Sequence, residues 1–223
     1  MKSTIPPNEI SSASQDYIKA ILALELAGEP ATTSALANRM GVSAPSATGM
    51  AKRLAELGLV ERTPYRGVAL TDVGRRAALE VLRHHRLLER YLVETLGLPL
   101  DEVHGEAERL EHVLSEELEA RIDEALGFPT HDPHGDPIPD RNLQLTTTPR
   151  RSLIDLAPGE RGTIASVPDG DAERLRYLAG LALIPGQDVE LATLEPFDGP
   201  AIVRTSTGEH AIARTLAALI RIS

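Results

Sequence analysis

Residues 36–46, LANRMGVSAPS, determine the fold of the first part of the chain. Ala37 is small enough to let two helices approach each other, and Gly41 permits a tight turn between them. Ser43 is a favourable N-cap for the second helix, and Pro45 is tolerated in its first turn because an N–H there has no helical partner. The segment therefore predicts a helix-turn-helix unit.

Elements typical of a winged helix surround this unit. A preceding helix is expected over residues 12–27, and the second helix of the unit is expected to run to Leu57. Two short strands, at residues 59–62 and 68–70, then form a hairpin that serves as the wing. The alternative is an ordinary three-helix cluster whose polar face is only solvated, and the added wing favours the DNA-binding interpretation.

Small and basic side chains are expected to contact different parts of the DNA. Small residues at the start of a recognition helix reach base edges, whereas basic residues farther along it and on the wing reach phosphates. The expected base contacts are Ser43, Pro45, Ser46 and Thr48, and the expected phosphate contacts are Lys52, Arg53, Arg62 and Arg66. Residues 1–73 carry seven Lys/Arg and seven Asp/Glu, so tight binding needs two copies of the unit or a switch.

The composition of the whole chain argues against several classes of protein. The 223 residues include no Cys, which rules out a disulfide framework and a thiolate metal site. No apolar run approaches the roughly 18 residues of a membrane span, and the start, MKSTIPP, lacks the apolar core of a signal peptide. A cytoplasmic protein without membrane contact is expected. The net charge of −10 lies entirely behind residue 73.

Histidine and glutamate gather in the segment behind the wing. On one helix, at about 100° per residue, four of these side chains fall within roughly a third of the circumference; they are His104, Glu108, Glu111 and His112. His85 and Glu89, four residues apart, share a face of the preceding helix. Carboxylates and imidazoles without sulfur suit Mn²⁺ or Fe²⁺. The alternative is a solvated Glu-rich face with incidental histidines.

The other histidines are expected to have lesser roles. His84 should lie on a different side of its helix, at the surface, and His210 has no evident role. His131 and His134 lie in a stretch, residues 128–149, that holds five prolines, and they are not expected to bind metal.

A change of composition divides the rest of the chain. A long helix is expected over residues 74–96 and another over about 100–127, with a bend near Gly105. Short β-type runs between Gly/Pro turns then predict a small SH3-like β-barrel. The expected parts are a winged helix-turn-helix domain at 1–73, a helical metal-binding and dimerisation domain at 74–140, a linker at 141–152 and the SH3-like domain at 153–223.

Five segments of the chain together resemble one known family. They are DYIKAI at residues 16–21, SAPS at 43–46, HRLLER at 85–90, VHGEAERLEHV at 103–113 and GDPIP at 135–139. The sequence is similar in them to the diphtheria toxin repressor and manganese transport regulator family of metal-dependent transcriptional repressors. The tail resembles, more weakly, that family's SH3-like, iron-transport-A-like domain. The resemblance implies a homodimer that binds palindromic operators and represses metal-uptake genes when metal is bound.

The resemblance also implies two groups of metal ligands. The first group would be Asp16, Glu108, Glu111 and His112. The second, ancillary group would be His85, Glu89 and His104, which in long-tailed members also receives ligands from the SH3-like domain. Asp171 and Glu173 lie near where such ligands would fall.

Three positions bear on the identity of the metal. In the family, the position of Glu108 is Cys in iron-type members and Glu in the manganese type, and the position of Asp16 is Met in the former and Asp in the latter. Both favour Mn²⁺ here, with Fe²⁺ as the alternative. Lys19, however, stands where the manganese type has a bridging Glu, which argues against a second closely bridged metal.

Two other functions compete with this interpretation. Residues 108–112, ERLEH, differ by one residue from the inverted zinc-peptidase motif, but Glu108 replaces the first histidine ligand, so no enzyme is expected. A winged-helix regulator that senses an organic ligand would need an aromatic or apolar pocket, and aromatic residues make up only 3% of the chain.

Overall fold

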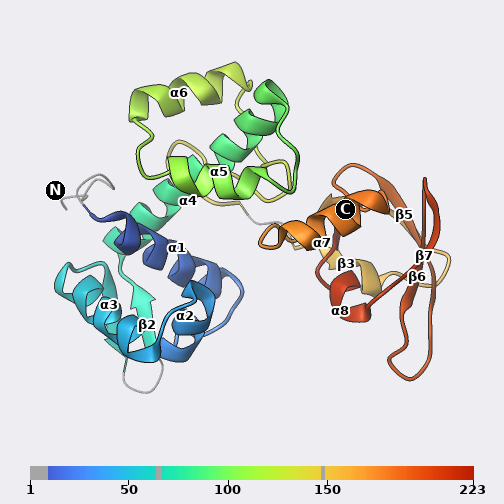
Figure 1. The fold of residues 1–223 in the computed structure, drawn as a ribbon, viewed down its shortest axis with the longest axis horizontal. Coiled ribbons are helices and arrows are strands. Elements are labelled where there is room, and N and C mark those ends of the chain that lie inside the picture. Colours follow the sequence, from blue (N-terminus) through green and yellow to red (C-terminus); the bar gives the residue numbers. More distant parts are fainter. Residues whose placement is uncertain (1–9, 64–66, 147–148) are drawn as a thin grey trace. The chain divides into compact units, whose positions relative to one another are not determined.

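The structure, a computed structural model, describes residues 10–63, 67–146 and 149–223 (Figure 1). It contains two compact units, and each is described by itself. The first unit comprises residues 1–85, 109–120 and 139–145, and the second comprises residues 86–108, 121–138 and 146–223.

The first unit begins with the predicted helix-turn-helix and wing. The helices are α1 (Ser12–Leu26), α2 (Thr33–Met40) and α3 (Ala44–Glu56), followed by the antiparallel strands β1 (Val60–Thr63) and β2 (Gly67–Leu70). Side chains of Ser11, Thr32 and Ser43 cap the three helices, each accepting a hydrogen bond from a backbone N–H three residues later. Gly41 ends α2 at φ 63°, a left-handed conformation that glycine adopts without steric cost. The predicted helix-turn-helix and wing are confirmed, with Ser43 as the predicted N-cap of α3.

One apolar core holds these helices together. Ile18, Ile21 and Leu22 of α1 are almost completely buried, together with Leu36 and Leu54 of the next two helices. The same core takes in the start of α4 (Asp72–Leu96), a long helix whose first half belongs to this unit and whose second half belongs to the other. The Thr71 side chain caps α4 by accepting from the backbone N–H of Gly74 at 3.0 Å.

The sequence predicted one continuous helix over about residues 100–127, and this prediction is wrong. The structure has two helices, α5 (Val103–Leu110) and α6 (Glu116–Ala125), separated by a turn. The Ser115 hydroxyl accepts from the backbone N–H of Leu118 and starts α6 anew. The predicted bend near Gly105 is also wrong, because Gly105 lies inside α5.

The C-terminal part of the second unit contains a six-stranded antiparallel sheet. Its order is β3-β8-β4-β5-β6-β7. The strands are β3 (Arg151–Ser152), β4 (Arg161–Ser166), β5 (Asp188–Leu194), β6 (Ala201–Thr205), β7 (Gly208–Ile212) and β8 (Arg221–Ile222), accompanied by the helices η2 (Leu153–Asp155), α7 (Ala172–Gly180) and α8 (Arg214–Ala217). Leu175 and Leu178 of α7 pack with buried side chains of the sheet in a second apolar core.

The predicted closure of this sheet into a barrel is not seen. Among the described residues, β3 and β7 remain the two edges of the sheet and do not pair with each other. Because β3 and β8 are only two residues long, they offer few hydrogen bonds at that side. The domain is therefore a small sheet with helices rather than a closed barrel.

Candidate metal centres and DNA-binding surface

A first cluster of potential metal ligands joins α1 to the turn after α5. Potential ligand atoms of Asp16, Glu111 and His112 all lie within 4.8 Å of one another. The His112 Nε2 atom is 2.9 Å from Asp16 Oδ1 and 3.7 Å from Glu111 Oε1. The other ring nitrogen, Nδ1, donates to the Gln15 side-chain oxygen at 2.6 Å, so that Nε2 is left to ligate a metal. Sequence reasoning missed Gln15, which lies buried beside Asp16.

Glu111 is the most buried member of this cluster. It is 1% exposed, and its two oxygens accept from Lys19 Nζ, at 2.6 Å, and from His85 Nδ1. Burial alone would raise the pKa of Glu111, but the His85 hydrogen bond and the charge of Lys19 outweigh it and lower that pKa. Glu111 is therefore ionised and suited to bind a divalent cation.

Glu108 does not lie with these three residues. It is more than half exposed, and its Oε1 atom is 3.6 Å from His104 Nε2, one helical turn away on α5. Glu108 is not part of the potential metal group of Asp16, Glu111 and His112, and its role as a ligand stays a prediction.

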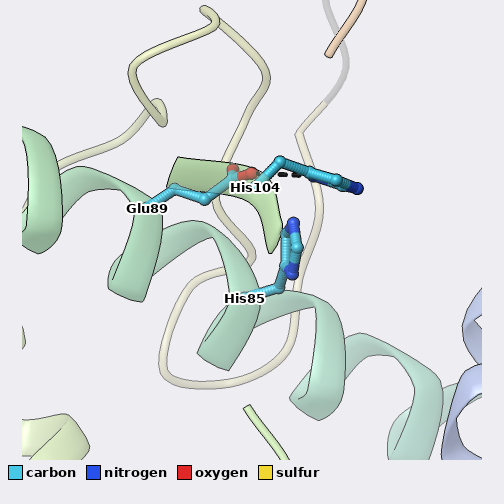
Figure 2. Close-up of side chains that lie close together, drawn as sticks. All are labelled: His85, Glu89 and His104. Carbon is cyan, nitrogen blue, oxygen red and sulfur yellow. Dashed lines mark hydrogen bonds and ion pairs between the residues drawn. The ribbon is translucent and has the colours of Figure 1, made fainter. Parts of the chain in front are cut away.

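A second cluster lies along α4 and α5. Figure 2 shows His85 and Glu89 projecting from the same face of α4 toward His104 of α5. The His104 Nδ1 atom is 3.0 Å from Glu89 Oε1, and potential ligand atoms of the three residues lie within 4.8 Å of one another. Glu89 is fully buried, which is costly for a carboxylate unless a positive charge compensates it. A bound cation would supply that charge.

This cluster continues into residues that the sequence did not indicate. Potential ligand atoms of Glu89, His134 and Asp169 also lie within 4.8 Å of one another. Asp169 lies in the segment before α7, two residues ahead of the N-cap, whereas the N-cap itself is Asp171, the predicted ligand, which is exposed and accepts from the Arg174 N–H at 3.0 Å. Glu173 is exposed in the first turn of that helix. Neither Asp171 nor Glu173 belongs to a potential metal group within the described ranges.

His134 is positioned by the backbone around it. Gly135, at φ 89°, lies so close to β4 that an added Cβ would be 1.9 Å from the Ala165 carbonyl oxygen, and the His134 carbonyl accepts from the Val167 N–H. The imidazole is completely buried, and its Nε2 donates to the Leu100 carbonyl at 3.2 Å. Its Nδ1 is 3.6 Å from Glu89 Oε2 and has no hydrogen-bond partner among the described residues.

The electrostatics of this position fit a cation. Burial lowers the pKa of His134, but Glu89 and Asp132 outweigh it and raise that pKa to about 9. Asp132 is buried too, and burial is the main reason why its pKa rises to about 7. Its Oδ2 atom lies 3.4 Å from Arg86 Nε. His134 Nδ1, which is buried without a hydrogen-bond partner among the described residues, lies 3.6 Å from Glu89 Oε2, and a divalent ion held by both side chains would satisfy it. The residues present therefore fit a metal.

The expected surface position of His84 is wrong. It is 3% exposed, because the neighbouring Arg83 and His84 both bind Glu119 of α6. The His84 Nδ1 atom also lies 3.1 Å from the Glu111 carbonyl oxygen. With both ring nitrogens so used, His84 holds α6 and the Glu111 backbone in place, and it also forms a potential metal group with Glu80 and Glu116.

The predicted DNA-contacting residues lie on the open side of α3. Ala47, Ala51 and Leu54 form its buried face, while Ser43, Pro45, Ser46, Thr48, Lys52 and Arg53 are exposed, as is Arg62 of the wing. The Ser43 and Ser46 hydroxyls bind each other at 2.8 Å, and the Thr48 hydroxyl donates to the Ala44 carbonyl at 2.9 Å. Arg66 lies outside the described residues.

Three family models match successive parts of the chain. The N-terminal DNA-binding domain of iron-dependent repressors matches residues 9–68, and their metal-binding and dimerisation domain matches residues 71–140. A FeoA domain matches residues 151–223. The iron-dependent repressor IdeR of Mycobacterium tuberculosis is 33% identical over 211 residues, which cover 88% of this chain and 90% of IdeR. The chain belongs to the iron-dependent repressor family.

Other members of the iron-dependent repressor family agree with this. The diphtheria toxin repressor of Corynebacterium efficiens is 33% identical over 193 residues, covering 82% of this chain and 84% of that protein. A solved manganese-dependent transcriptional repressor in complex with manganese is 42% identical, with a TM-score of 0.86, over 94% of this chain and 98% of that one. ScaR with bound Cd²⁺ is 30% identical, with a TM-score of 0.82, at the same coverage. This chain is accordingly a metal-dependent, DNA-binding transcriptional regulator.

Proposed function

We propose that this regulator senses Mn²⁺, with Fe²⁺ as an alternative activator, and represses metal-uptake genes when the ion is bound. The observation that carries the proposal is the cluster of Asp16, Glu111 and His112. Asp16 lies on α1 of the DNA-binding domain, whereas Glu111 and His112 follow α5 of the metal-binding domain. An ion held by all three would fix the orientation of the recognition helix α3.

The donor set supports Mn²⁺ over softer metals. The cluster offers two carboxylates and one imidazole, and the chain has no Cys. Mn²⁺ binds most weakly in the divalent series, so a site that must respond to it gains by excluding thiolate, which favours Zn²⁺. The relative IdeR is named as an iron-dependent repressor, and one similar solved structure is named as a manganese-dependent repressor. Both Fe²⁺ and Mn²⁺ suit these oxygen and nitrogen donors.

Lys19 supports a single ion at this cluster. Its ammonium group is 2.6 Å from Glu111 Oε1 and mostly buried, so it already supplies one positive charge to that carboxylate. A second divalent ion bridged by Glu111 would be repelled by the ammonium group. We infer that the cluster of Asp16, Glu111 and His112 binds one ion.

The second cluster supports an ancillary metal site that involves the C-terminal domain. Glu89, His104 and His85 would provide ligands from α4 and α5, and His134 and Asp169 would add ligands from the Pro-rich segment and the segment before α7.

The proposed domain boundaries are those expected from the sequence. The domains cover residues 1–73, 74–140 and 153–223, with a linker at 141–152, and the three family matches support this division.

The regulator is proposed to act as a homodimer on palindromic DNA. Leu110, Val113 and Leu118 expose 39%, 76% and 50% of their surface near the α5–α6 turn, which supports an apolar dimer contact there. A two-fold dimer would place its α3 helices in successive major grooves about 34 Å apart.

No helix of the described chain is long and apolar enough to cross a membrane. We propose a cytoplasmic regulator rather than an enzyme.

The experiment that tests this function is binding to promoter DNA in the presence of defined metals. A duplex selected from random-sequence DNA by the Mn²⁺-loaded protein serves as the operator in fluorescence anisotropy. Operator binding should strengthen on addition of Mn²⁺ and weaken with a chelator. Equal binding under both conditions would refute metal dependence.

A further inference from the structure

A third group of potential metal ligands lies between α4 and α6, apart from the two clusters described above. It consists of Glu80 and His84 of α4 and Glu116 of α6, whose potential ligand atoms all lie within 4.8 Å of one another. Glu80 and His84 are four residues apart and therefore share one face of α4. Within the described ranges, the groups around Asp16 and Glu89 share none of these residues.

The His84 ring has the orientation that a metal ligand needs. Its Nδ1 atom lies 3.1 Å from the Glu111 carbonyl oxygen, which can only accept, so Nδ1 carries the proton. Metal-binding histidines usually donate their other ring N–H in this way. The opposite nitrogen, Nε2, faces carboxylates, with Glu119 Oε2 at 3.1 Å. His84 is 3% exposed, so the packing around the ring holds this orientation.

Glu80 and Glu116 bring two carboxyl groups into contact across the two helices. A hydrogen bond links their side chains, and burial, followed by this hydrogen bond and the charge of Glu116, raises the pKa of Glu80 to about 7. Two carboxyl groups in contact share a proton or a cation, because two negative charges so close together repel each other. A metal ion would take the place of the shared proton.

The charges around this group match one divalent ion. Its carboxyl groups, together with the neighbouring one, belong to Glu80, Glu116 and Glu119, and Arg83 already pairs with Glu119. When His84 is neutral, as a ligand must be, and all three carboxyl groups are ionised, two negative charges remain uncompensated. One divalent cation would compensate both. Glu116 is exposed, so the ion can enter from solvent and keep a water molecule as a further ligand.

We propose that Glu80, His84 and Glu116 form a separate site for one divalent cation, which ties the start of α6 to α4. The site is independent of the proposed sensing of Mn²⁺ at the first cluster. One imidazole, two carboxylates and a water molecule form a donor set that Zn²⁺ accepts. Zn²⁺ also binds nitrogen and oxygen donors more tightly than Mn²⁺ does, so it is the probe of choice.

The test counts the Zn²⁺ ions that the full chain binds in equilibrium dialysis at a buffered free Zn²⁺ concentration. Glu80→Gln and Glu116→Gln each remove one carboxylate and keep a side chain of the same shape. Each variant should bind one ion fewer than the wild type, or bind that ion at least about tenfold more weakly. Glu124→Gln, exposed on the same helix, is the matched control and should bind like the wild type. Asp16→Asn should lose a different ion, so that Asp16→Asn/Glu116→Gln loses two.

Each failure points to a different error. The site is overturned if Glu80→Gln and Glu116→Gln bind Zn²⁺ like the wild type, or if Glu124→Gln loses as much, because general surface charge would then hold the ion. An unchanged count in Asp16→Asn would overturn the first cluster and leave this site standing. Thermal unfolding gives a second measurement, since a bound ion stabilises the folded chain. Zn²⁺ should raise the Tm of Asp16→Asn more than that of Asp16→Asn/Glu116→Gln, and equal rises would also overturn the site.

Discussion

The buried carboxylate of Glu119 should be essential for both stability and metal binding. It accepts from Arg83 Nε at 2.5 Å and lies 3.1 Å from His84 Nε2, and all three residues are buried. Changing Glu119 to Gln removes the negative charge and leaves two buried cationic side chains without it. Breaking a buried pair in this way costs about 3–5 kcal/mol, a large part of the about 5–15 kcal/mol of a typical protein.

The effect should also reach the first metal cluster. His84 holds the Glu111 carbonyl through its other ring nitrogen, so loss of Glu119 loosens the backbone of a metal ligand. Thermal unfolding followed by circular dichroism should show a Tm lowered by at least about 6 °C, at about 2–4 °C per kcal/mol for a chain of this size. Calorimetric titration should show weaker Mn²⁺ binding. Glu124→Gln, exposed on the same helix, should change neither.

The pH dependence of the stability that Glu119 adds supplies a further test. Burial raises the pKa of Glu119, but the hydrogen bonds from His84 and Arg83 outweigh it, so that pKa lies below its ordinary value. The stability that this carboxylate adds is present at neutral pH and disappears as the pH falls through the lowered pKa. The difference in Tm between wild type and Glu119→Gln should shrink on acidification. A variant as stable as the wild type at neutral pH would refute the reasoning.

Three further predictions concern metal and DNA binding. Asp16→Asn should abolish the response of operator binding to Mn²⁺ in fluorescence anisotropy, while Asp171→Asn, which keeps a capping side chain, should retain it; the opposite ranking would contradict the assignment of the first cluster. Arg53→Ala should weaken binding to all duplexes alike and lower the salt slope by about one, whereas a relaxed sequence preference at unchanged slope would show that Arg53 reads bases. Glu108→Cys, which places a thiol beside the potential ligand His104, should shift activation toward Zn²⁺ or Fe²⁺ in metal titrations; an unchanged metal ranking would show that Glu108 is not a ligand that selects the metal.

Local signals in the sequence were enough to predict the winged domain. Ser43 and Gly41 act through contacts within a few residues, so their effect is visible without knowledge of the rest of the fold. The break between α5 and α6 was not predicted, because apolar residues such as Ala107 and Leu114 continue at helical spacing across it. The open sheet was missed for a related reason, since the pairing of short strands depends on residues far apart in the chain.

The metal ligands show the same division. Asp16, Glu111 and His112 were predicted together through the resemblance, and the structure brings them together. At residues 169, 171 and 173 the sequence offers three alternating acids, and only the start of α7 shows which one caps the helix and which one faces Glu89. The role of His134 depends on the approach of Gly135 to β4, a contact that the sequence around it does not reveal.

The most direct test of the account is the operator affinity of the full-length chain measured with and without metal. Fluorescence anisotropy on the selected duplex, in chelator and in saturating Mn²⁺, gives the coupling between metal and DNA binding. Because Asp16 of the DNA-binding domain shares a cluster with Glu111 and His112, we predict tighter binding with Mn²⁺ by about 1–3 kcal/mol, or about 5–150-fold. Equal affinity in chelator and in Mn²⁺ would contradict the account.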